Sequence, residues 1–174
     1  MLMVASGIAL VVVLALSVVL ARRDANASAN PTQFALSSAV QAAEHVYKAN
    51  HDRFPLGPSL VVRLHRNDPE LAFAYGPQYV VSSNGGSGGQ YTATGISVAV
   101  SSNGQVIMFA APGSSRTCWY ATDNHLADHL SPGLNGASPH KGTMFATAGS
   151  QQVCTAGAAL PGNVSVWSAT WPST

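Results

Sequence analysis

The spacing of apolar positions divides the chain into three parts. The opening "MLMVASGIALVVVLALSVVLA" contains 21 residues and no charged side chain. At about 1.5 Å per residue, a helix of this length would span the roughly 30 Å hydrocarbon core of a bilayer. We therefore predict a hydrophobic helix over residues 1–23 that serves as a transmembrane segment.

Two alternatives concern this opening segment. A secretory signal peptide cut after Ala27 is one, although such peptides usually place an apolar region of about 7 to 15 residues behind a basic start. No Lys or Arg precedes the apolar run here. The second alternative is a cytoplasmic location of the downstream chain. Arg22 and Arg23 favour it, because positive residues tend to lie on the cytoplasmic side of a membrane segment. The two cysteines favour the outside instead.

The second part, residues 24–55, has the spacing of an amphipathic helix. Asn30 and Pro31 make an N-cap and first-turn pair. Apolar residues then recur at steps of four, three and four, which places them on one helical face. These helix-sheet packing residues are Leu36, Val40, Ala43 and Tyr47. The helix is expected to end before Pro55, because a residue preceding proline is disfavoured in the helical region.

The third part, residues 56–174, predicts a globular β-rich domain. Residues 56–77 contain three prolines and are expected to be irregular. Short strand candidates follow, and Asn103-Gly104 between two of them is a strong hairpin signal. The fold class predicted is therefore α+β: a long N-terminal helix, with a membrane-spanning first half and an amphipathic second half, packed on an antiparallel β-sheet.

The charge balance limits the classes of partner. The 174 residues include 8 Lys and Arg against 7 Asp and Glu, a formal net charge of +1. No nucleic-acid partner is predicted, because such partners need a basic surface. Only 9% of residues are charged, against roughly 25% in ordinary soluble proteins, so the surface is expected to be polar but uncharged.

Two cysteines, Cys118 and Cys154, are the only ones in the chain. A disulfide between them is predicted, and closing a loop of this size would stabilise the fold by about 4 kcal/mol on the chain-entropy model. Two buried free thiols are the alternative.

Candidate metal ligands are concentrated in one short stretch. His125, Asp128 and His129 of "HLADH" would share a face if this stretch were helical. Asp123 and Asn124 offer oxygen ligands for calcium, which needs roughly six to eight oxygens. Turn formation and solvated polar side chains explain both groups more simply, so we predict no metal, no cofactor and no catalytic residue. The sequence also lacks a nucleophile elbow, a phosphate loop and a dinucleotide fingerprint, so we predict that the protein is not an enzyme.

Two segments, "VYKANHDRFP" and "TCWYATDN", resemble type IV pilins and the related pseudopilins of type II secretion systems. The resemblance implies a structural subunit of a pilus-like or pseudopilus filament, stored in the cell membrane by a single pass and displayed in an extracellular filament. It implies as partners other copies in a helical filament, other pilin-like subunits, the membrane and its assembly machinery. The implied filament-core residues are Ala5, Gly7, Ala9, Val12 and Leu16. The opening departs from such proteins in lacking an acidic residue.

A membrane-tethered extracellular binding domain that does not polymerise is the alternative function. It would need the same opening segment and the same disulfide, so these two features do not separate it from a filament subunit.

Overall fold

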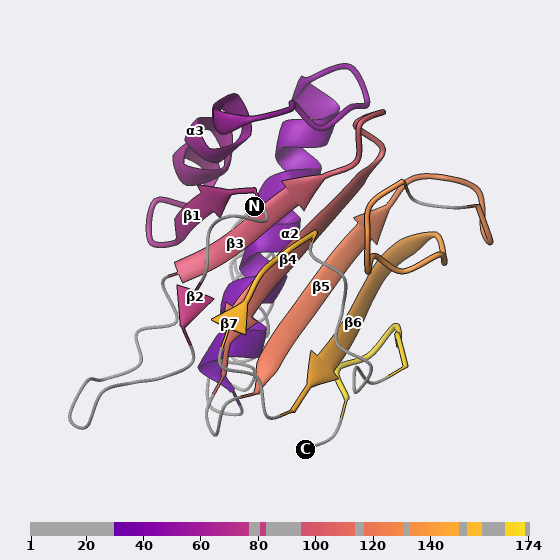
Figure 1. Cartoon of the computed structure of the whole chain (residues 1–174). Helices are drawn as coiled ribbons and strands as arrows, with labels where there is room; N and C mark the ends of the chain where they lie inside the picture. Colours follow the sequence, from indigo (N-terminus) through magenta and orange to yellow (C-terminus); the bar gives the residue numbers. More distant parts are fainter. Residues whose placement is uncertain are drawn as a thin grey trace, which may run out of the picture.

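The computed structural model describes residues 30–76, 81–82, 95–113, 117–130, 133–149, 153–157 and 166–172 (Figure 1). The predicted filament-core residues and the possible cleavage position all lie outside these ranges. The described elements are the helices α2 (Pro31–Ala49) and α3 (Pro58–Asn67), and the strands β1 (Ala72–Tyr75), β2 (Val81–Ser82), β3 (Gly95–Val100), β4 (Val106–Pro112), β5 (Cys118–Asn124), β6 (Gly142–Ala148) and β7 (Val153–Cys154).

Helix α2 begins at a side-chain cap. Asn30 is extended, with φ of −162°, and its Oδ1 accepts a hydrogen bond of 3.0 Å from the Thr32 N–H. Pro31 occupies the first turn, where its missing N–H costs nothing. At the other end, His51 and Asp52 both have φ of 56°, a left-handed conformation that stops the helix.

Five strands form one mixed sheet in the order β1-β3-β4-β5-β6. Strand β1 runs parallel to β3, and the other three pairings are antiparallel. A separate antiparallel pair joins β2 to β7. Figure 1 shows α2 on one face of the large sheet and β7 on the other.

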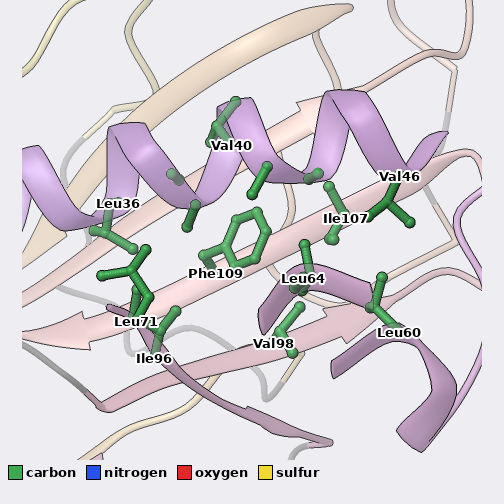
Figure 2. Packing of buried hydrophobic residues seen from close by; sticks show 14 of the residues in the cluster. Leu36, Val40, Val46, Leu60, Leu64, Leu71, Ile96, Val98, Ile107 and Phe109 are labelled. Carbon is green, nitrogen blue, oxygen red and sulfur yellow. The ribbon is translucent and has the colours of Figure 1, made fainter. Parts of the chain in front are cut away.

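The core has two layers because successive strand residues point to opposite faces. The larger cluster unites α2 and α3 with one sheet face, and Figure 2 shows Phe109 beneath α2 and beside Ile107. The smaller cluster lies on the opposite face, towards β7. Its buried members are Ala99, Met108, Ala110, Cys118, Tyr120, Ala146, Ala148, Cys154 and Ala156.

The predicted fold class is wrong in two respects. Among the described residues there is no long helix but two short ones, since α2 starts at Pro31 directly after the extended Asn30. The sheet is mixed rather than antiparallel, because β1 joins β3 in parallel. A parallel pair needs a crossover connection, and residues 76–94 supply the length for one. The short strands and the hairpin signal in the sequence predict only antiparallel pairing.

The segment after Pro55 was also predicted incorrectly. Residues 56–77 contain α3 and β1 instead of irregular chain. Pro58 does not break α3 because it occupies the first turn, and Gly57 before it has φ of 74°. Leu60 and Leu64, four residues apart, are completely buried and fix α3 against the core (Figure 2).

The localisation prediction is corrected as well. In the described ranges, no helix has both the length and the apolar character that crossing a bilayer requires. This finding contradicts the prediction of a single-pass membrane protein.

The predicted disulfide is confirmed. Cys118 on β5 and Cys154 on β7 are bonded, with Cα atoms 5.5 Å apart. Both residues are completely buried. The bond ties the small β2-β7 pair to the large sheet.

Candidate functional site

A group of polar and aromatic residues lies where the end of α2 meets the sheet, and we call this cluster the joint. It contains Glu44, Tyr47, Phe54, Gln105, Asp123 and His125. Glu44 and Tyr47 lie one turn apart on α2, whereas Asp123 is the penultimate residue of β5 and His125 directly follows the strand. The joint therefore links the helix to the turn between β3 and β4 and to the end of β5.

Tyr47 is the central side chain of the joint. Its ring is stacked on the His125 imidazole, with centroids 3.8 Å apart and planes inclined by 9°. Its hydroxyl donates a hydrogen bond of 2.9 Å to Gln105 Oε1. Gln105 Nε2 in turn donates to the Asp52 carbonyl at 2.9 Å. Tyr47 and Gln105 together connect α2, the turn after it and the turn before β4.

Phe54 closes the apolar side of the joint. Its ring is 2% exposed, and its centroid lies 4.8 Å from that of Tyr47. The Phe54 N–H donates to the Gly104 carbonyl at 2.8 Å. Gly104 has φ of +70°, and a Cβ placed on it would lie 2.9 Å from the Phe54 carbonyl oxygen. The turn therefore requires glycine both for its conformation and for this close approach.

Two carboxylates and an imidazole form the polar side of the joint. His125 Nε2 lies 3.0 Å from Asp123 Oδ2 and 3.5 Å from Glu44 Oε1. Burial opposes the protonation of His125, but the hydrogen bond and charge of Asp123 and the charge of Glu44 outweigh it and raise the pKa of this histidine. Burial, followed by the hydrogen bond and charge of Asp123, raises the pKa of the Glu44 carboxyl.

The two neighbouring carboxylates favour the protonated form of His125. Asp123 is nearly completely buried, and a buried carboxylate is stabilised by a cationic partner. A protonated His125 supplies that partner and reaches both acids. The joint therefore combines ion pairs with stacked rings, and the strength of the ion pairs depends on the charge of His125.

The residues predicted to pack the helix on the sheet are all buried members of the larger cluster. Their exposed fractions are 0% for Leu36, 7% for Val40, 0% for Ala43 and 8% for Tyr47. Tyr47 has the additional polar role described above, which the apolar stripe did not indicate.

The grouping of His125, Asp128 and His129 that a helical stretch would have produced does not occur. The stretch is not helical, because Asn124 Oδ1 accepts the Leu126 N–H at 2.9 Å and His129 has φ of 63°. His125 belongs to the joint, whereas Asp128 and His129 lie near His140.

The side chains of Asp123 and Asn124 point to opposite faces of the sheet, as those of adjacent strand residues do. Asp123 meets Glu44, while the Asn124 amide donates to the Ser138 carbonyl at 3.1 Å. A calcium site that uses both side chains is therefore not formed.

Sequence reasoning missed Glu44 and His140. The position of Glu44 one turn before Tyr47 on α2 was the only signal that it belongs near the same partner. His140 lies beyond the "HLADH" stretch, and no spacing rule connects it with Asp128.

The chain matches no protein-family model, no curated protein and no solved structure. The resemblance to type IV pilins and pseudopilins consequently rests on the residues that carry it, and the function it implies stays a prediction.

Proposed function

We propose that this protein is a non-enzymatic structural subunit that assembles with copies of itself, and with similar pilin-like chains, into a pilus-like filament. The uncharged opening segment supplies the apolar contacts between subunits. Ala5, Gly7 and Ala9 are small enough for close approach there.

The observation that carries the proposal is the place of the resembling segments in the fold. "VYKANHDRFP" supplies Tyr47 and Phe54, and "TCWYATDN" supplies Asp123. All three residues belong to the joint, with stacked rings, a buried aromatic ring and a paired carboxylate. Residues with these contacts hold a helix to a sheet, which is the role expected in a subunit whose globular part must stay attached to its assembly segment.

Two further features support a structural role. The Cys118–Cys154 disulfide fastens the side of the sheet that faces away from α2. Thr32 at the start of α2 donates from Oγ1 to the Pro112 carbonyl at 3.1 Å, so both ends of the helix are bonded to the sheet. Such cross-connections resist separation of the layers.

Charge substitutions in the opening segment test the proposal. Gly7→Arg and Ala9→Arg would each bury an unpaired charge between subunits, which costs several kcal/mol. We expect the chain to leave the filament fraction that sediments from producing cells, while the disulfide still forms. Val166→Arg is the matched control, because Val166 is 89% exposed.

Two outcomes would contradict the proposal. If the charged variants sediment like the unmodified chain, the opening segment does not contribute to assembly. An unmodified chain that never sediments in filaments would favour a binding module that does not polymerise.

A further inference from the structure

A second cluster of side chains lies on an outer loop, apart from the joint. Asp128 and His129 follow β5, and His140 lies two residues before β6. One carboxylate oxygen and one ring nitrogen from each histidine lie within 4.8 Å of one another. Asp128 and His129 are exposed and His140 is partly exposed, so solvent reaches the cluster.

The distances suit ligands of a single ion. Asp128 Oδ1 lies 3.2 Å from His140 Nδ1, and Asp128 Oδ2 lies 3.5 Å from His129 Nε2. Nitrogen and oxygen ligands bind zinc at about 2.0–2.2 Å in a tetrahedron, which places neighbouring donors about 3.4 Å apart. Each carboxylate–imidazole pair therefore has nearly the separation that one ion requires, and the ring nitrogens of the two histidines lie within 4.8 Å of each other.

The loops that carry these side chains are held together by hydrogen bonds from the backbone. The His129 N–H donates to the Pro139 carbonyl at 3.2 Å, and the Lys141 N–H donates to Asp128 Oδ1 at 3.2 Å. The buried Asn124 amide donates to the Ser138 carbonyl. The His129–Pro139 and Asn124–Ser138 hydrogen bonds fix the two segments relative to each other, and neither involves a proposed ligand atom.

We propose that Asp128, His129 and His140 bind a divalent late transition-metal ion of the zinc type. Two imidazoles and one carboxylate suit such an ion, whereas calcium and magnesium prefer ligands that are all oxygen. Because the site is open to solvent, water or a group from another molecule completes the coordination. This proposal is independent of filament assembly.

The joint offers a second set of three donors, from Glu44, Asp123 and His125. This set is closed: Asp123 is buried, and the His125 ring is stacked on Tyr47. It is therefore the weaker candidate, and the experiment must distinguish the two.

Isothermal titration of the full-length chain with zinc chloride tests the proposal. We expect one ion per chain, and we expect His129→Ala and His140→Ala each to weaken binding by at least about tenfold. His45→Ala is the control, since His45 is exposed on α2 and should leave binding unchanged. Absence of zinc binding, or unchanged binding in both loop variants, would overturn the proposal. So would loss of binding in His125→Ala alone.

A measurement on the unmodified chain guards against variants that fold poorly. Nuclear magnetic resonance of the histidine ring nitrogens during a zinc titration should move the signals of His129 and His140 and leave that of His125 in place. Movement of His125 instead would assign the ion to the joint, and magnesium chloride should move none of these signals.

Discussion

The Tyr47 ring lies flat against the His125 imidazole, 3.8 Å between centroids, and thereby joins the last turns of α2 to the residue that follows β5. The two residues are far apart in the sequence, and each has a second partner: Gln105 for Tyr47 and Asp123 for His125. The contact is therefore part of a connected set, and changing one member should affect the others.

Substitutions of Tyr47 separate its hydroxyl from its ring. Tyr47→Phe removes the hydrogen bond to Gln105 and should lower the free energy of unfolding by about 1 kcal/mol. Tyr47→Ala also removes the packed ring and should cost about 3–5 kcal/mol. Denaturant unfolding of both variants measures the difference. Equal losses would show that the stacked ring contributes nothing beyond the hydroxyl.

Stability should depend on the charge of His125. Its pKa in the folded chain is raised above the ordinary value of 6.5, since Asp123 and Glu44 outweigh the effect of burial. A raised histidine pKa contributes stability that is complete below 6.5 and is lost as the pH rises through the folded value. The unmodified chain should therefore lose stability as the pH rises from 6.5 through the raised folded pKa of His125, by more than His125→Gln does.

Glu44 adds a contribution of the same sign at lower pH. Its raised pKa favours the protonated carboxyl in the folded chain, so this contribution is complete below 4.5 and declines as the pH rises through the folded value. Unfolding of the unmodified chain and of His125→Gln across the pH range separates the Glu44 contribution from the His125 contribution. His45→Gln is the exposed control on the same helix. A parallel pH profile for His125→Gln and the unmodified chain would contradict the assignment.

Gly104 should not tolerate a side chain. Gly104→Ala would place a methyl group 2.9 Å from the Phe54 carbonyl oxygen at a φ of +70°. We expect a loss of at least about 1 kcal/mol, because the left-handed conformation and the contact both oppose the change. Gly149→Ala is the control, since a Cβ there would meet no atom within 4 Å. Comparable thermal midpoints for the two variants would refute the close approach.

Reduction of the disulfide should destabilise the fold without removing it. The bond closes a sequence separation of 36, for which chain entropy gives about 4 kcal/mol. Urea unfolding with and without a reducing agent should show this loss. Cys118→Ala combined with Cys154→Ala should make stability insensitive to the reducing agent, and an unmodified chain that is equally insensitive would contradict the prediction.

Local patterns in the sequence predicted local structure well. The steps from Leu36 to Tyr47 are those of a helix, Asn30 caps it, and Asn103-Gly104 lies in the turn between β3 and β4. Each of these signals involves residues close in sequence, where spacing alone fixes geometry.

What the sequence did not predict depends on contacts between distant segments. Strand β1 pairs with β3 across a long connection, and only the fold reveals that the pair is parallel. Glu44 meets Asp123 and His125 because α2 crosses the end of β5. His140 joins Asp128 through the pairing of β5 with β6, which no motif encodes. The α3 helix was missed because Pro58 was interpreted as a breaker rather than as a first-turn residue.

Electron microscopy of filaments collected from cells that produce this chain, with mass spectrometry to identify the protein in them, tests filament assembly most directly. We expect thin filaments in which this chain is a principal component, and we expect them to be lost from cells that make Gly7→Arg. Filaments that form without this chain, or a chain found only as separate molecules, would contradict the proposed assembly.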